Sequence, residues 1–230
     1  MKTIAIIGAG KNLGLSLAKR FGKEGFQIAL VARNGEKLQT MADELKDLSV
    51  EVTAFPADIS KKEDILKTLA DIKTKYGTID VLEFSPLTWD YPPASVLEMT
   101  PESVIYHFEN QVMSAINIVN HVVPDMITRG EGALLFTTGL SAFHPIPMMG
   151  NAGIAMAGLR NYLTNLTTEL LTKGILVANR SVAVQIGSGI GKENDPDTIA
   201  DMWYQVYENR DSGEAIYPQD FDPKVLSAVR

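Results

Sequence analysis

The stretch TIAIIGAGKNLG at residues 3–14 decides the fold class of this 230-residue chain. Ile4–Ile7 is apolar at every position, which predicts a strand buried on both faces. The glycines that follow permit a sharp turn, and Leu13–Glu24 then has the apolar period of a helix. The apolar face of that helix is formed by Leu13, Leu17, Ala18 and Phe21. A buried strand, a glycine turn and a helix predict the opening unit of an α/β fold.

The same alternation of short apolar runs and longer helical segments continues along the chain. Further strands are expected at residues 26–32, 50–56, 80–84, 133–137 and within 175–186, and helices at 35–47, 61–76, 101–126, 152–171 and 196–207. Strands this apolar on both faces, separated by helices, are typical of a parallel sheet covered on both sides. Residues 1–230 are therefore predicted to form one Rossmann-type, doubly wound α/β domain of about seven strands.

The end of the chain is predicted to be irregular. The polar, glycine-rich stretch that begins at Gly187 indicates a lid or substrate loop around residues 187–207. The residues after it are expected to form a short, loose C-terminal tail. No linker or internal repeat divides the chain, so this stretch is interpreted as part of the single domain.

Composition excludes several classes of protein. The chain carries 21 basic and 28 acidic residues, a formal net charge of −7, which argues against nucleic acid as a partner. It contains no cysteine, so disulfides and thiolate metal sites are excluded, and no His, Asp and Glu cluster has the spacing of metal ligands. No apolar run is long enough to span a membrane, and the first residues do not resemble a signal peptide. A soluble, cytoplasmic protein without a membrane partner is expected.

The glycine turn suggests a phosphate-binding site. Glycines let backbone amides approach a pyrophosphate closely, and the positive end of the following helix then stabilises the phosphate charge. A tight strand-to-helix turn needs glycine for its geometry alone, so the turn by itself leaves a purely structural role open. Its place at the first strand–helix junction favours the dinucleotide-binding interpretation.

Gly8–Gly14 resembles the cofactor loop of the short-chain dehydrogenase/reductase superfamily, whose usual form is Thr-Gly-x-x-x-Gly-x-Gly. The outer glycines match, whereas Ile7 replaces the threonine and Asn12 replaces the middle glycine. The resemblance covers the chain to about residue 190, through Ala57-Asp58-Ile59, Gly77–Leu82, Pro124-x-Met126 and Gly132–Phe136, and the family's Asn-Asn-Ala-Gly is Glu83-Phe84-Ser85-Pro86 here. The cofactor contacts that it implies are Gly8, Gly10, Lys11, Asn12, Leu13, Gly14, Asp58, Ile59, Ser85, Pro86 and Gly187.

Charges favour NADP(H) over NAD(H) as the cofactor. In NAD-binding members of this fold, an acidic residue after the second strand hydrogen-bonds the ribose 2′-hydroxyl. This chain has Ala32 there, followed by Arg33, and Lys11 lies in the glycine turn. Two cations without an acid suit a 2′-phosphate, although surface cations are commonly only solvated. We therefore expect Arg33 and Lys11 to bind the 2′-phosphate of NADP(H).

The four catalytic positions of the superfamily are all substituted in this chain. There a tyrosine transfers the proton, a lysine lowers the pKa of that tyrosine, a serine hydrogen-bonds the reacting oxygen, and an asparagine completes a proton relay. By ungapped counting these positions fall on Ala152, Met156, Gly139 and Gln111. A shift of one residue gives Asn151, Ala155 and Asn110 at the tyrosine, lysine and asparagine positions, which restores the asparagine alone. The usual proton transfer is therefore not expected, and the catalytic residues are unknown.

Three side chains on neighbouring loops are candidate substitutes. Ser141 and His144 follow the fifth strand, and Tyr91 follows the fourth. A histidine is a good general acid near neutral pH. His144 also has a structural interpretation, as a loop residue that caps backbone groups, and Tyr91 another, as an anchor beside two prolines.

The segment Asp195–Trp203, with Arg210-Asp211 after it, is similar to the C-terminal pattern of an atypical branch of this superfamily. In that branch the tyrosine is often missing and the lysine is usually kept, so Met156 is a further departure. Two hypotheses stay open. One is an NADP(H)-dependent oxidoreductase acting on a small carbonyl or alcohol with a rearranged proton donor. The other is a protein that binds NADP(H) as a sensor or scaffold without catalysis. The resemblance also implies a homodimer or homotetramer formed through helices 101–126 and 152–171.

Overall fold

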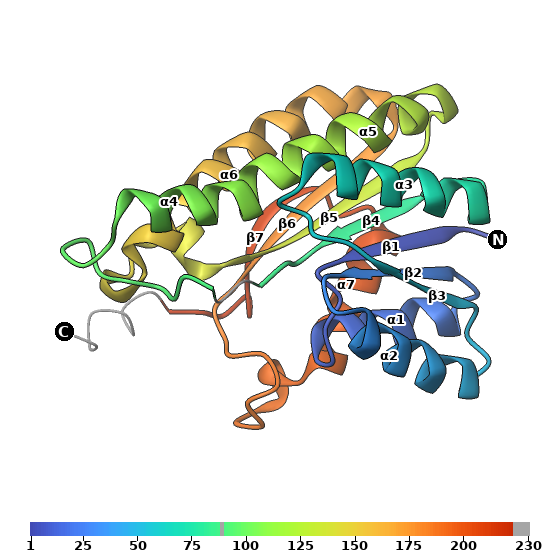
Figure 1. The fold of residues 1–230 in the computed structure, drawn as a ribbon, viewed down its shortest axis with the longest axis horizontal. Coiled ribbons are helices and arrows are strands. Elements are labelled where there is room, and N and C mark those ends of the chain that lie inside the picture. The colour runs from blue at the N-terminus through green and yellow to red at the C-terminus, as the bar shows by residue number, and fades with distance from the viewer. Residues whose placement is uncertain (88–89, 223–230) are drawn as a thin grey trace.

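The computed structural model describes residues 1–87 and 90–222 of the chain. Their strands form one seven-stranded, all-parallel sheet in the order β3-β2-β1-β4-β5-β6-β7 (Figure 1). The strands are β1 (Thr3–Ile7), β2 (Gln27–Ala32), β3 (Val52–Pro56), β4 (Val81–Phe84), β5 (Gly132–Gly139), β6 (Ile175–Val182) and β7 (Gly213–Tyr217). The helices are α1 (Leu13–Lys23), α2 (Gly35–Asp47), α3 (Lys62–Tyr76), α4 (Pro101–Phe108), α5 (Ser114–Arg129), α6 (Gly150–Leu170) and α7 (Pro196–Asn209). The prediction of a doubly wound, Rossmann-type sheet is confirmed.

The sheet order fixes where a ligand site is expected. From β1 the chain moves outward to β2 and β3, and then returns across β1 to β4 and the strands beyond it. The order therefore reverses between β1 and β4. In open parallel sheets a crevice forms at this reversal, outside the carboxyl ends of the strands.

The helices divide into two layers, one on each face of the sheet. Figure 1 shows α3, α4, α5 and α6 together on one face, and α1, α2 and α7 on the other. Each layer buries its own apolar cluster against the sheet. In α1, Leu13, Leu17 and Phe21 recur at helical spacing and are all buried, as the sequence pattern predicts.

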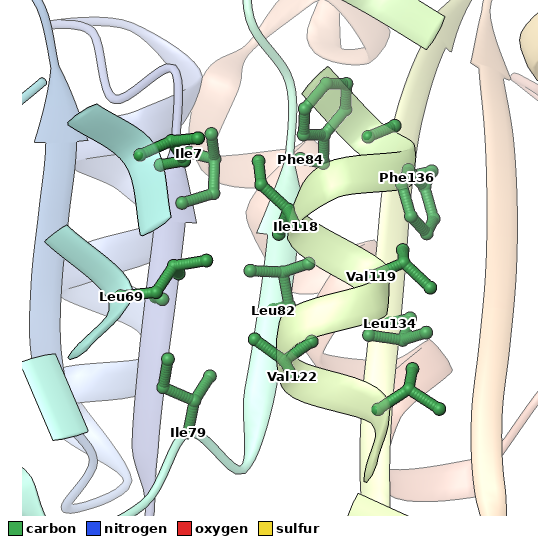
Figure 2. Close-up of a cluster of buried hydrophobic side chains, with 14 of the residues drawn as sticks. Ile7, Leu69, Ile79, Leu82, Phe84, Ile118, Val119, Val122, Leu134 and Phe136 are labelled. Carbon is green, nitrogen blue, oxygen red and sulfur yellow. The ribbon is translucent and has the colours of Figure 1, made fainter. Parts of the chain in front are cut away.

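The packing of α5 against the middle of the sheet is drawn in Figure 2. Ile118, Val119 and Val122 of α5 point toward the β4 and β5 side chains, among them Phe84 and Phe136. The two phenylalanine rings lie with their centroids 5.6 Å apart. This apolar packing against α5 holds the carboxyl ends of β4 and β5 in place.

The single helix expected at 101–126 is interrupted in the structure. Residues Glu109–Met113 form a π-helical turn between α4 and α5, and α5 continues to Arg129. A π turn inserts one extra residue into a helix and is frequent at functional sites. Apolar periodicity does not reveal it, because both flanking helices keep the same buried face. The helix expected from Ala152 begins two residues earlier, at Gly150.

The prediction of a loose tail is wrong, because Gly213–Tyr217 pairs with β6 as the edge strand β7. The range 187–207, expected to be a lid or substrate loop, is a loop only in its first part. From Pro196 onward the chain is α7, which packs against α1 and buries Ile199 and Trp203 completely. A helix held by a fully buried indole covers the sheet and is not a lid. No helix in the described ranges is long and apolar enough to cross a membrane.

Truncating Leu69 tests the packing between α3 and the sheet. Leu69 is fully buried, so Leu69→Ala should lower the free energy of unfolding by about 2–5 kcal/mol. The control Leu171→Ala removes the same atoms from a side chain that is 66% exposed, and should change stability by less than about 0.5 kcal/mol. Urea denaturation measures both. Equal losses in the two variants would contradict the packing described here.

Candidate functional site

The turn after β1 lies directly against the end of β4. Gly8 has φ +89°, and a Cβ there would lie 2.5 Å from Pro86 Cα and 2.9 Å from the Ser85 carbonyl carbon. Only glycine permits both this backbone conformation and this close approach. Ser85 N also donates to Ile7 O, so the end of β4 is tied to the end of β1. The structure thus brings together Gly8, Ser85 and Pro86, which the sequence analysis assigns to one site.

The N-terminus of α1 opens on the same side. The Asn12 side chain makes no capping hydrogen bond there, and the first turn of α1 holds no acidic residue. The loop after β6 also reaches this point, because Gly187 has φ +75° and a Cβ on it would lie 2.8 Å from Asn12 Nδ2. The turns after β1, β4 and β6 therefore meet around an uncapped helix N-terminus, which is the electrostatic setting that favours an anion.

The remaining residues of the glycine turn serve different purposes. Gly14 packs against Ala9, and a Cβ on Gly14 would lie 2.8 Å from Ala9 Cα. Leu13, the first residue of α1, is buried in the core, whereas Gly10 and Lys11 are exposed at the surface. We refer to the surface made by Gly8–Asn12, Ser85, Pro86 and Gly187 as the cradle.

Arg33 does not stand free of acidic groups, contrary to the expectation. Its Nη1 donates to Asp90 Oδ2 at 2.7 Å, and this contact raises the pKa of Arg33. The Tyr106 hydroxyl of α4 donates to the same Asp90 oxygen at 2.7 Å. Asp90 lies 57 residues further along the chain than Arg33, so no local pattern reveals the pair. The acid missing from the end of β2 is supplied by the loop after β4.

Asp58 and Ile59 follow β3, on the side of Arg33. Ile59 is buried, while Asp58 is partly exposed and its Oδ1 accepts hydrogen bonds from the Ser60 amide and hydroxyl. The Asp58 charge also contributes to the raised pKa of Arg33, which shows that the two groups are neighbours. Asp58 is therefore placed at the adenosine end of the predicted site.

Gln111 lies in the π turn and reaches the cradle. Its Nε2 donates to Pro86 O at 3.1 Å, and the side chain is buried. The neighbouring Asn110 instead donates from its side chain to Tyr106 O within its own helix. Gln111 is thus the residue of the two that supports the end of β4.

The first turn of α6 is closed off by the loop after β4. Asn151 is completely buried: its Oδ1 accepts from Ala94 N, and its Nδ2 donates to Pro92 O. Gly150 N donates to Ala94 O at 2.7 Å. Of the two positions aligned with the tyrosine and lysine, Ala152 is buried and Met156 is partly exposed, and neither carries a titratable group.

Ser141 lies between Gly139 of β5 and Gly153 of α6. A Cβ on Gly139 would lie 3.7 Å from Ser141 Oγ, and one on Gly153 would lie 3.7 Å from Ser141 Cβ. The hydroxyl is buried and has no hydrogen-bond partner among the described residues. A buried hydroxyl without a partner loses the hydrogen bonds it makes in water, so its presence calls for an explanation.

The other two candidate substitutes have neighbours of their own. The His144 ring lies 6.3 Å from the Phe221 ring, and His144 N donates to Leu140 O. Tyr91 is 41% exposed, and its ring lies 5.1 Å from that of Tyr106. The Tyr91 backbone also hydrogen-bonds His107, which supports the interpretation of Tyr91 as a loop anchor.

A buried carboxyl at the end of β4 was not singled out by the sequence analysis. Glu83 is completely buried, and it accepts from Thr137 Oγ1 at 2.9 Å and from Ser85 Oγ at 2.9 Å. Trp203 Nε1 donates to the same Thr137 oxygen at 3.0 Å. Desolvation raises the pKa of Glu83 to about 8, against the two hydroxyl hydrogen bonds that lower it. The sequence signal that could have identified Glu83 is a single acidic residue inside an otherwise apolar strand.

No group of three His, Asp or Glu that could hold a metal occurs in residues 1–87 and 90–222.

Comparisons with known proteins agree with this architecture. A family model described as short chain dehydrogenase matches residues 2–193. The 3-oxoacyl-(acyl-carrier-protein) reductase FabG of Staphylococcus epidermidis is 24% identical over 178 residues, 76% of this chain and 72% of that protein. The inactive hydroxysteroid dehydrogenase-like protein 1 of Rattus norvegicus is 28% identical over 178 residues, 75% of this chain and 52% of that protein. The structure of L-sorbose reductase from Gluconobacter frateurii, complexed with NADPH and L-sorbose, superposes with a TM-score of 0.83 at 21% identity, covering 94% of each chain.

Replacing the buried carboxyl should change how stability depends on pH. Burial raises the pKa of Glu83 to about 8 in the folded chain from the 4.5 of an ordinary glutamate, so between these values only the unfolded chain releases the proton. The contribution of protonated Glu83 to the free energy of unfolding is complete below pH 4.5 and is lost as the pH rises toward 8. The free energy of unfolding falls by about 1.4 kcal/mol per pH unit in this range.

Glu83→Gln removes this slope while keeping the size of the side chain. Urea denaturation at several pH values should therefore show the variant gaining stability on the wild type as the pH rises to 8. All other titrating groups are shared and cancel in the difference. A constant difference across this range would contradict a protonated Glu83.

Proposed function

The chain belongs to the short-chain dehydrogenase family, and from that membership we propose that it is an oxidoreductase that binds NADP(H) and acts on a small carbonyl or alcohol. The observation that carries the proposal is the cradle. Three turns that are far apart in sequence meet at the uncapped N-terminus of α1, and Gly8 lets the backbone approach the end of β4. This arrangement suits a pyrophosphate, because backbone amides and the helix dipole both favour its charge.

The preference for NADP(H) rests on Arg33. Arg33 follows β2, where the adenosine ribose is expected, and Lys11 is exposed on the glycine turn. A 2′-phosphate carries more charge than the Asp90 carboxylate and offers three acceptor oxygens, so it competes effectively for the guanidinium. NADPH is the cofactor bound in the L-sorbose reductase structure, which supports the same choice.

Ser141 is the residue we assign to the reacting oxygen. When bound, the cofactor supplies a hydride to the carbonyl carbon, and the carbonyl oxygen then needs a hydrogen-bond donor and a proton. Ser141 Oγ is buried, has no hydrogen-bond partner in residues 1–87 and 90–222 and lies beside Gly139, so its hydroxyl is available to donate to that oxygen. His144, three residues further on, is the candidate that delivers the proton, directly or through a water.

The proposal includes assembly into a homodimer or homotetramer. Ile105, Met113 and Ile154, on α4, the π turn and α6, are about half exposed although they are large and apolar. Apolar side chains gathered on neighbouring helices are typical of a protein–protein contact. The expected partner is a second copy of the chain.

A second function is favoured by one observation. By the ungapped count, the two α6 positions of the family's acid–base pair fall on Ala152 and Met156, neither of which transfers a proton. General acid–base catalysis contributes about 10²- to 10⁴-fold in rate, so its loss leaves at most slow turnover. On this alternative the chain binds NADP(H) and acts as a sensor or scaffold. One of its relatives is itself named as inactive.

Ser141→Ala separates the two functions. If the chain reduces carbonyls, the variant should lose about 100-fold in kcat with a carbonyl panel, because one donor to the developing oxyanion is removed. NADPH binding should be unchanged. The control Ser95→Ala removes a hydroxyl that donates to the surface residue Glu98, and His144→Ala tests the proton donor. NADPH binding without turnover in the wild type, across the whole panel, would establish the second function instead.

Arg33→Gln tests the choice of cofactor. Loss of the guanidinium should weaken NADPH binding about 10- to 100-fold and leave NADH binding nearly unchanged, because only NADPH carries the 2′-phosphate. Asp90→Asn should act in the opposite direction by releasing Arg33. Lys67→Gln, which removes an exposed cation on α3, is the matched control. Equal weakening of both nucleotides by Arg33→Gln in a calorimetric titration would refute the assignment.

A further inference from the structure

Glu83, Ser85, Thr137 and Trp203 form a hydrogen-bonded network that runs from the buried interior of the fold to the cradle. Glu83 is completely buried, whereas Ser85, two residues further on and on the same face of β4, is partly exposed. The Ser85 backbone also abuts Gly8, the first glycine of the turn. Ser85 therefore joins the buried carboxyl to the cradle: its hydroxyl contacts Glu83, and its backbone lies against Gly8.

The direction of each hydrogen bond in the network can be deduced from Trp203. The indole Nε1–H can only donate, so Thr137 Oγ1 accepts it and has its own proton left for Glu83 Oε1. This bond keeps the same direction whether Glu83 is ionised or protonated, because a carboxylic acid still offers one carbonyl oxygen. The contact with Ser85 is the one that changes.

In the two states of Glu83, the Ser85 proton points in different directions. When Glu83 is ionised, Ser85 Oγ–H donates to Oε2 and is fully used. When Glu83 is protonated, Oε2–H donates to Ser85 Oγ, and the serine proton is released from the carboxyl for another acceptor. The 2.9 Å separation fits either direction.

We propose that Glu83 is a positioning residue that, in its protonated form, makes Ser85 a hydrogen-bond donor to an acceptor oxygen of the dinucleotide in the cradle. The inference rests on the proposed binding of NADP(H). It makes cofactor affinity depend on the protonation of a side chain that never touches the cofactor. Burial, with no cation of the described residues in hydrogen-bond contact, favours the protonated form of Glu83 near neutral pH.

Other charged groups lie near this network, and their titration must be separated from that of Glu83. Glu83 lies between Ile6 of β1 and Leu135 of β5, and contacts Thr137 and Ser85 through hydrogen bonds. Beyond Trp203 of α7 lies Arg180 of β6, whose Cζ is 6.0 Å from the indole ring and which pairs with Asp211 at 2.6 Å. Around the expected cofactor lie Lys11, Arg33, Asp58, Asp90 and His144. All of these groups are retained in Glu83 and Ser85 variants, so their titrations cancel in the comparison.

The test is the dissociation constant for NADPH between pH 7 and pH 9.5 in the wild type, Glu83→Gln and Ser85→Ala. In the wild type it should rise about tenfold over this range, which corresponds to the loss of one hydrogen bond. Glu83→Gln, whose amide always donates to Ser85, should bind as tightly as the wild type at pH 7 and show no such rise. Ser85→Ala should bind about tenfold more weakly at pH 7 and should also lack the rise.

An exposed pair of the same chemistry serves as the matched control. Ser95 Oγ donates to Glu98 Oε2 at 2.9 Å on the surface, so Ser95→Ala and Glu98→Gln should leave the wild-type pH profile unchanged. Infrared difference spectra between wild type and Glu83→Gln, recorded without nucleotide, should show the carbonyl stretch of a protonated carboxylic acid at pH 7 and its loss at high pH.

The outcomes separate the inference from the function on which it rests. Tight NADPH binding with no pH dependence in the wild type, a rise of equal size in Ser85→Ala, or no protonated carboxyl in the infrared spectrum overturns the role of Glu83 and leaves the proposed function standing. Absence of NADPH binding at every pH overturns both.

Discussion

The structure depends on the close approach between the turn after β1 and the end of β4. Gly8 has a left-handed backbone, and its Cα faces Pro86 at a distance that leaves no room for a Cβ. Because β1 and β4 flank the reversal of the strand order, this contact lies where open parallel sheets bind their ligands. Gln111 in the π turn and Asn12 beside Gly187 then add their contacts at the same place. The site is thus a product of the sheet topology as much as of the glycine motif.

The same strand end holds a buried carboxyl, Glu83. A carboxyl without a cation beside it is costly to bury, and an apolar residue at position 83 would avoid that cost. The carboxyl is nevertheless joined to two hydroxyls and, through Thr137, to a fully buried indole. Exceptions to the usual rules of burial concentrate at functional sites. A role for Glu83 in preparing the cradle accounts for both the cost and the position.

The limits of prediction from sequence follow from the range of each interaction. Strands and helices whose apolar pattern is local, such as β1 and α1, were predicted nearly to the residue. β7 was missed because Gly213–Tyr217 has a weak apolar pattern and becomes a strand only by pairing with β6. The π turn was missed because it preserves the buried face on either side. The Arg33–Asp90 pair and the Asn151 contacts to the loop after β4 join distant segments, so they carry no signal in sequence spacing. Motif counting located Gly139 and Ala152, but only the structure shows that Ser141 lies beside Gly139 and Gly153.

A crystal structure of the chain grown with saturating NADPH tests the central claim most directly. We predict electron density for the pyrophosphate at the N-terminus of α1, the 2′-phosphate on Arg33 with Asp90 displaced, and the nicotinamide facing Ser141. An empty cradle in the presence of saturating NADPH, or a nucleotide bound at another place on the chain, would contradict the account.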